Sequence, residues 1–169
     1  ERARAIKSQE EVACVKASLH ATEIAVARLR QSLRPGLSEN ALWSILHQAV
    51  IAQNGDYVET RLLSSGQRTN PWFQESGNRV IGKNELVALN TDVVGCYGYY
   101  ADFSRTFHSG PDDPNVDQRQ LYAAAYEQIH HNMELLHHGL AFREYAQRAW
   151  QIPEKYFVNR YYLSAHGVG

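Results

Sequence analysis

The chain has 169 residues, 44% of them apolar, which is enough to bury the core of one ordinary domain. Its 17 lysines and arginines against 18 aspartates and glutamates give a net charge of −1, so there is no electrostatic reason to expect nucleic acid or an anionic membrane as partner. No apolar run approaches the roughly 20 residues of a membrane-spanning helix, and the first residues lack the apolar stretch of a signal peptide. We therefore expect a soluble protein.

Two helices are predicted in the first third of the chain. Ser8 and Glu11 form a capping box, in which each side chain can satisfy a free amide at a helix start. Apolar residues then recur at steps of three and four as far as Leu33, where a proline and a glycine follow. Ser38 can cap a second helix, which we expect to end at residues 54–55.

Short apolar runs broken by glycine, asparagine and proline follow, and this texture is typical of strands. We expect strands at residues 60–63, 85–92 and 97–107, of which the last two form a hairpin. Apolar spacing then predicts a third helix from Tyr122 to Gly139, a short helix near residues 142–152 and a strand near 160–164. Helices, then strands, then helices favour an α+β fold over a parallel wound sheet.

The two cysteines, Cys14 and Cys96, could form one bridge at most, too few for a small scaffold held together by disulfides. This favours a reducing, cytoplasmic location. The chain begins with Glu1 and stops at Gly169 in a glycine-rich turn, so we expect it to be a fragment.

Asp92 and Asp102 lie on opposite arms of the predicted hairpin, nearly symmetric about its turn. Cross-strand neighbours have Cβ atoms about 5 Å apart, and like charges placed so are destabilising unless a cation lies between them. Because carboxylate oxygens suit divalent metals, the pair is a candidate metal site. The alternative is two solvated acids at strand ends, and the geometry alone does not choose between them.

His166, between Ala165 and Gly167, is a candidate third ligand, because small flanking residues allow close approach to the imidazole. A single histidine is more often a hydrogen-bonded structural residue, so this assignment rests on the wider pattern. The paired histidines of the third helix cannot chelate one ion, because seven residues of helix span about 10 Å.

Three segments together resemble the pita-bread metallopeptidase and creatinase family: NELVALNTD at residues 84–92, GYYADFSRTF at 98–107, and HGVG at 166–169. The resemblance runs from about Ile6 to the end of the chain. It implies a pita-bread catalytic domain over residues 1–169, lacking an upstream domain and the last strands.

The resemblance also implies the site. Asp92, Asp102 and His166 would be metal ligands, with two glutamates beyond residue 169 completing the set. The cofactor would be one or more divalent ions of iron, manganese, cobalt or zinc. A small-molecule substrate and a homodimer are further implications.

The sequence departs from the peptidase pattern of this family. Asp92 and Asp102 are ten residues apart, where the peptidases usually have eleven, and Pro71 is followed by Trp72, where they have a substrate-side histidine. These features, with the segment RTNPWFQE at residues 68–75, are similar to the branch that includes the dimethylsulfoniopropionate lyases. The resemblance then implies release of dimethyl sulfide and acrylate, with an aspartate base just beyond Gly169.

A sulfonium substrate would suit an aromatic wall, because ring faces attract cations. Trp72 is a candidate, and Tyr161 matches a substrate-positioning tyrosine of the lyases; for most other aromatic residues we expect ordinary packing. Arg68 could bind the substrate carboxylate or anchor its own loop. Val158 replaces an expected tryptophan and Asn90 an expected acid.

Three hypotheses follow. The first is a metal-dependent carbon–sulfur lyase, and the second is an Xaa-Pro-type metalloaminopeptidase, a hydrolase in which metal-bound hydroxide would attack an amide. The third is a pita-bread binding module without catalysis, which the presence of all three implied ligands disfavours. We expect these 169 residues alone to be inactive.

Overall fold

A computed structural model describes residues 2–168. The chain divides into two compact units, which are described separately: Glu1–Asp112 with Gly167–Gly169, and Asp113–His166. The fold is α+β, as predicted. Within the described residues, no helix is both long enough and apolar enough to cross a membrane.

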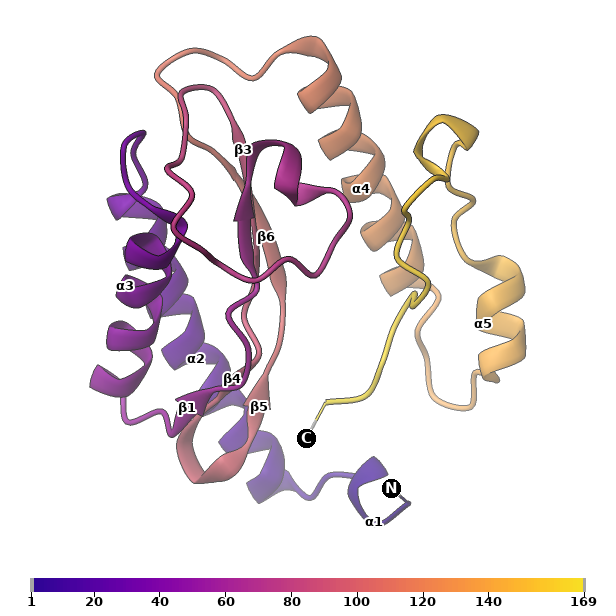
Figure 1. The fold of residues 1–169 in the computed structure, drawn as a ribbon. Helices are drawn as coiled ribbons and strands as arrows, with labels where there is room; N and C mark the ends of the chain where they lie inside the picture. The colour runs from indigo at the N-terminus through magenta and orange to yellow at the C-terminus, as the bar shows by residue number, and fades with distance from the viewer. Residues whose placement is uncertain (1, 169) are drawn as a thin grey trace. The chain divides into compact units, whose positions relative to one another are not determined.

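Two long helices, α2 at Gln9–Ser32 and α3 at Glu39–Ala52, pack side by side against the strands of the first unit (Figure 1), and the short α1 at Arg2–Ala5 precedes them. The predicted capping box is confirmed, because Ser8 accepts from the Glu11 amide and Glu11 accepts from the Ser8 amide. Ser38 caps α3 by accepting from the Ala41 amide at 3.1 Å. The two longer helices bury their apolar sides against the strands, and the centre of this core includes Leu29, Leu42, Leu46, Leu63, Ile81 and Leu89.

In the part of the chain that the structure describes, six short strands form two three-stranded antiparallel sheets. One has the order β1-β4-β5, with β1 at Tyr57–Val58, β4 at Val93–Val94 and β5 at Tyr100–Ala101. The other has the order β2-β3-β6, with β2 at Leu63–Ser65, β3 at Leu86–Asn90 and β6 at Ser104–His108. Short 3-10 turns follow β2 at Gly66–Thr69 and β4 at Cys96–Gly98.

The two sheets are parts of one antiparallel meander with three arms, each interrupted in the middle: β1 with β2, β3 with β4, and β5 with β6. The second and third arms form the hairpin, and they keep one register on both sides of the interruption. Asn90 pairs with Ser104 in one half, and Val93 pairs with Ala101 in the other. The predicted hairpin is therefore confirmed, with an interruption near residue 92. The strand expected at 60–63 lies slightly later, at β2, where Leu63–Ser65 form the ladder with residues 87–89 of β3.

The second unit contains α4 at Val116–Glu134, α5 at Phe142–Arg148 and a 3-10 turn at Glu154–Tyr156. Both helices were predicted, although a capping box at Asn115 starts α4 earlier than its apolar spacing suggested. The prediction of a strand near residues 160–164 is wrong. A strand needs a hydrogen-bonded neighbour, and the described part of this unit contains no strand to provide one.

Candidate metal centre

Asp92 and Asp102 lie directly opposite each other on the hairpin. The register that pairs Asn90 with Ser104 and Val93 with Ala101 also brings these two aspartates together. Both side chains are half-buried, and the Oδ1 atom of Asp102 is buried. The prediction that the two acids face each other is thus confirmed in register.

The Asp92 carboxylate is held at both oxygens. Thr60 donates its hydroxyl to Oδ2 at 2.5 Å, and the Asn90 amide donates to Oδ1 at 2.8 Å. The backbone of Asp92 has a φ of 39°, which side-chain-bearing residues seldom adopt and which is often found at functional sites. Asp92 is therefore fixed through both its backbone and its side chain.

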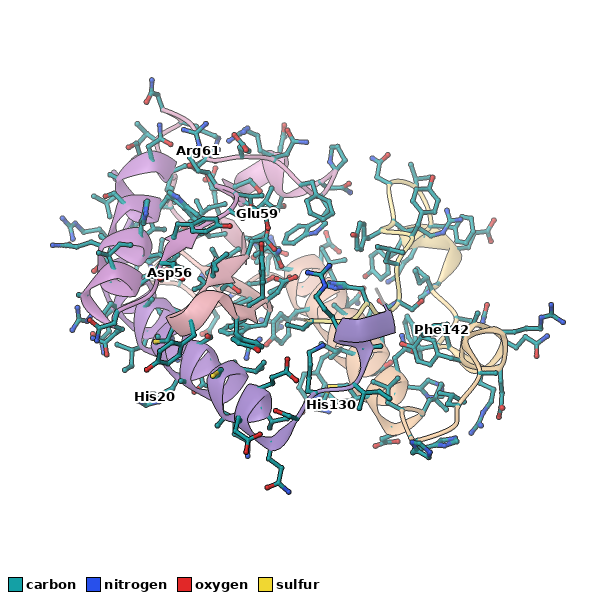
Figure 2. The ribbon with its side chains drawn as sticks, turned by 90° about the horizontal axis from the view of Figure 1, so that it is seen from below. His20, Asp56, Glu59, Arg61, His130 and Phe142 are labelled. Carbon is teal, nitrogen blue, oxygen red and sulfur yellow. The ribbon has the colours of Figure 1, made fainter. Side chains whose placement is uncertain are left out.

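An extra residue in the neighbouring arm brings Thr60 to this position. Four residues, 59–62, separate Val58 from Leu63, whereas three, 90–92, separate their partners Leu89 and Val93. One arm thus carries a bulge opposite the candidate site, and bulges typically redirect a side chain. Glu59 and Arg61 of the bulge, and Asp56 just before β1, are labelled in Figure 2.

Thr91 supports the backbone on both sides of Asp102. Its fully buried hydroxyl donates to the Ala101 carbonyl at 3.2 Å and accepts from the Phe103 amide at 2.9 Å. The Thr91 amide also donates to the Phe103 carbonyl at 3.2 Å. The side chain therefore replaces ladder hydrogen bonds where the strands are interrupted.

The donor set fits a divalent metal ion. Asp92 accepts from a neutral hydroxyl and a neutral amide, and no described Lys, Arg or His forms an ion pair with it. A half-buried negative charge that faces a second carboxylate is stabilised by a cation. Oxygen ligands of this kind suit hard and borderline divalent metals. Asp92 and Asp102 would hold such an ion.

His166 belongs to the second unit, so its role as third ligand stays a prediction. Among residues 2–168, no three His, Cys, Asp or Glu side chains gather closely enough to form a metal-binding group. The first unit thus supplies a pair of carboxylates.

Arg68 anchors its loop to helix α3. Its guanidinium pairs with Glu39, which is fully buried at the start of α3, and donates to the Glu75 carbonyl at 2.8 Å. Glu39 also accepts from the Ser65 amide and hydroxyl, both at 2.8 Å. These contacts fit the loop-anchor alternative, and binding of a substrate carboxylate by Arg68 stays a prediction.

The aromatic candidates lie in different units. Trp72 is half-buried and packs against Phe73 in the loop of the first unit, with ring centroids 5.8 Å apart. Tyr161 lies in the second unit and is 44% exposed. Their roles toward a substrate stay predictions.

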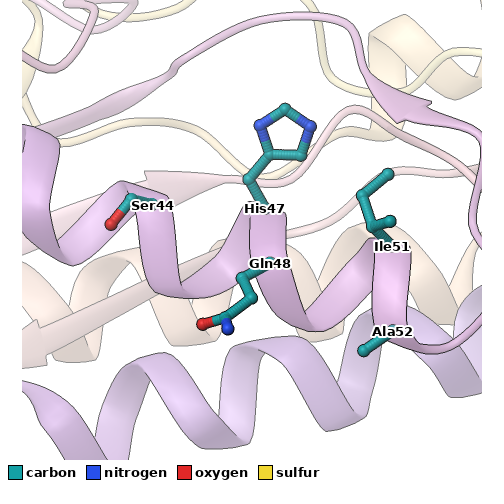
Figure 3. A pocket seen from close by; sticks show the side chains of 5 residues that line it. All are labelled: Ser44, His47, Gln48, Ile51 and Ala52. Atoms are coloured by element: carbon teal, nitrogen blue, oxygen red, sulfur yellow. The ribbon is translucent and has the colours of Figure 1, made fainter.

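A surface hollow along α3 is separate from these residues. Figure 3 shows it, and its lining consists of Ser44, His47, Gln48, Ile51 and Ala52. No predicted site residue is among them.

Sequence reasoning missed Thr60, Thr91 and Glu39 as supports of the site and its loop. Thr91 carried a weak signal, because it lies between Asn90 and Asp92 in a strand interrupted at a polar segment. Glu39 and Thr60 carried none, since their partners are 29 and 32 residues away in sequence.

Comparison with known proteins decides the family. Residues 13–169 match the model of metallopeptidase family M24. The chain belongs to this family. M24 enzymes depend on divalent metal ions, which agrees with the carboxylate pair.

Relatives within M24 include both lyases and peptidases. The dimethylsulfoniopropionate lyase DddP of Roseovarius nubinhibens is 38% identical over 174 residues, covering 100% of this chain and 39% of the lyase. The probable dipeptidase PepE of Mycobacterium tuberculosis is 25% identical over 175 residues, covering 99% of this chain and 45% of the dipeptidase. The chain thus spans less than half the length of these curated relatives.

The solved M24 structures support the pita-bread fold. The prolidase from Pyrococcus furiosus superposes with a TM-score of 0.87 at 21% identity, covering 99% of this chain and 50% of that chain. At this identity the likeness establishes the fold and leaves the reaction open. The expected pita-bread fold is therefore confirmed.

Proposed function

We propose that the protein is a metal-dependent carbon–sulfur lyase that cleaves dimethylsulfoniopropionate to dimethyl sulfide and acrylate. The observation that carries the proposal is the similarity to DddP, 38% over the whole chain, against 25% to PepE. The ten-residue spacing of the aspartates and Trp72 after Pro71 support it.

In this reaction a base removes a proton from the carbon next to the substrate carboxylate. A double bond forms between that carbon and its neighbour, and the carbon–sulfur bond breaks. Its electron pair leaves with sulfur as neutral dimethyl sulfide, and acrylate remains. Because sulfonium is a good leaving group, one base is sufficient and no water is consumed.

The residues of this chain would hold and orient the reactants. Asp92 and Asp102, with His166, would bind iron, manganese, cobalt or zinc. When bound, the ion supplies a Lewis acid that polarises the substrate carboxylate and acidifies the adjacent C–H. Trp72 and Tyr161 would face the sulfonium with their rings. The proposal includes a cytoplasmic location and a homodimer. Light scattering on the purified protein tests the homodimer.

The second candidate is an Xaa-Pro-type metallopeptidase. The match to the M24 model and the similarity to PepE favour it. In that reaction Asp92 and Asp102 would hold the ion that activates a water molecule toward an amide.

One paired assay separates these functions. The protein, expressed from its complete reading frame and supplied with iron, manganese, cobalt or zinc, is incubated with dimethylsulfoniopropionate or with an Xaa-Pro dipeptide. The lyase proposal predicts dimethyl sulfide in the headspace and no cleaved dipeptide. Dipeptide cleavage without dimethyl sulfide would establish the peptidase. A protein that binds metal but is inactive in both assays would act on another small molecule, and one that is inactive and also binds no metal would support a binding module.

A further inference from the structure

We infer that Thr60 and Asn90 are positioning residues that orient the Asp92 carboxylate for metal binding. This inference rests on the proposed metal at Asp92 and Asp102. It assigns a role to two side chains that are not themselves ligands.

The hydrogen bonds at Asp92 leave a lone pair on each carboxylate oxygen. Each carboxylate oxygen accepts one side-chain hydrogen bond, from Thr60 at 2.5 Å and from Asn90 at 2.8 Å. An oxygen that accepts one hydrogen bond keeps a second lone pair for another partner. Both donors are neutral, so they fix the orientation of the carboxylate without neutralising its negative charge, which a cation can still bind.

The Asn90 amide is itself oriented. Asn90 is 8% exposed, and its Oδ1 accepts from the Ser104 hydroxyl at 2.7 Å. Since this hydrogen bond occupies the oxygen, the NH₂ end of the amide faces Asp92. A chain of hydrogen bonds thus links Ser104 on β6 through Asn90 on β3 to the candidate ligand Asp92.

The bulge between β1 and β2 positions Thr60. Without the extra residue in 59–62, the registers of β1 with β4 and of β2 with β3 would be continuous. The bulge places the Thr60 hydroxyl on Oδ2, while the Glu59 amide donates to the Asp92 carbonyl at 3.0 Å. The arm thus contacts Asp92 through both its side chain and its backbone.

A positioning role and a purely structural role differ in what the substitutions change. Loss of either part-buried hydrogen bond lowers stability in both cases. Only a positioning role lowers the affinity for metal in protein that remains folded, because a ligand without its outer hydrogen bonds adopts other orientations.

The test measures metal binding, independently of activity. Metal-free protein from the complete reading frame is titrated with Co²⁺ by calorimetry, and visible absorption reports the coordination of the bound ion. Thr60→Val keeps the shape of the side chain and removes the hydroxyl, whereas Thr60→Ser keeps the hydroxyl. Asn90→Leu removes the amide. Thr106→Val, at an exposed position on β6, is the matched control.

We expect Thr60→Val and Asn90→Leu to weaken Co²⁺ binding about 10- to 100-fold and to change the cobalt spectrum. Thr60→Ser and Thr106→Val should bind like the wild type. Circular dichroism and urea unfolding identify any variant that does not fold. If Asn90→Leu does not fold, the comparison of Thr60→Val with Thr60→Ser tests the inference.

Two results would count against the inference, and they are distinguishable. Unchanged affinity and spectrum in folded Thr60→Val would show that its hydrogen bond serves the fold alone, with the metal site intact. No Co²⁺ binding by the wild type would overturn the proposed function, and the positioning role with it.

Discussion

Asp92 and Asp102 face each other in one hairpin register, at the level where all three arms of the sheet are interrupted. Regular strand pairing on both sides of the interruption holds the two aspartates opposite each other. At the interruption itself, Asp92 and Asp102 are not part of a regular strand ladder. Thr91 completes the arrangement, because its hydroxyl bonds to the backbone on both sides of Asp102.

The first prediction concerns the two carboxylates. Asp92→Ala and Asp102→Ala should each abolish metal retention and activity together, because one remaining carboxylate cannot hold the ion that the reaction needs. Asp56→Ala, at an exposed position before β1, is the control and should retain both. Metal content by mass spectrometry and dimethyl sulfide release are measured on the same samples. An active, metal-free variant would remove the ligand assignment.

The second prediction concerns Thr91. Thr91→Val keeps the side-chain shape but leaves the Phe103 amide and the Ala101 carbonyl without their bridging hydroxyl. We expect the free energy of unfolding to fall by about 1 to 3 kcal/mol, the usual penalty for buried polar groups that lose a partner. Urea unfolding measures this loss, with Thr106→Val on β6 as control. Equal stabilities of the two variants would argue against the bridging role.

The third prediction separates Arg68 from Arg61. Arg68→Ala leaves the charge of Glu39 buried without its partner, so the free energy of unfolding should fall by about 3 kcal/mol. This is the lower end of the range for a broken buried ion pair, because Arg68 is itself partly exposed. Arg61 pairs with Glu75 at the surface, where both side chains are more than half exposed. Arg61→Ala should therefore cost less than about 1 kcal/mol.

Thermal and urea unfolding of the two arginine variants provide the comparison. If Arg68→Ala were as stable as Arg61→Ala but bound substrate weakly, the substrate-binding alternative for Arg68 would be favoured over the loop anchor.

The fourth prediction concerns acid stability. Arg79 donates to both oxygens of Glu85, at 2.6 and 2.8 Å, and with the Gly82 amide these hydrogen bonds lower the pKa of Glu85. A carboxyl whose folded-state pKa is lowered contributes stability above its unfolded pKa, about 4.3 for glutamate, and loses it as the pH falls through the folded value. The wild type should therefore lose stability below about pH 4.3.

Glu85→Gln removes the titrating group and should flatten this part of the stability profile, while lowering stability at neutral pH. Urea unfolding between neutral and acidic pH measures both effects. Parallel profiles for the wild type and Glu85→Gln would contradict the role given to the Arg79–Glu85 pair.

Much of the fold could be predicted because its signals are local. The capping box at Ser8 and Glu11 lies within one helical turn. The facing aspartates follow from their near symmetry about a short hairpin, which one tight connection determines. By contrast, the expected strand at 160–164 depends on a neighbour, and apolar composition alone does not provide one.

The supports of the site could not be predicted for a physical reason. The contact of Thr60 with Asp92 depends on a one-residue difference between two registers, which no single segment of sequence reveals. The pairing of Arg68 with Glu39 likewise depends on how a loop packs against a helix 29 residues earlier in the chain.

Removal and return of metal test the central claim most directly. Protein from the complete reading frame is stripped with a chelator, and headspace dimethyl sulfide is measured before stripping, after it, and after addition of iron, manganese, cobalt or zinc. A metal-dependent lyase predicts release that disappears with the metal and returns when at least one of these ions is restored. Dimethyl sulfide release that persists undiminished in fully stripped protein would contradict the account.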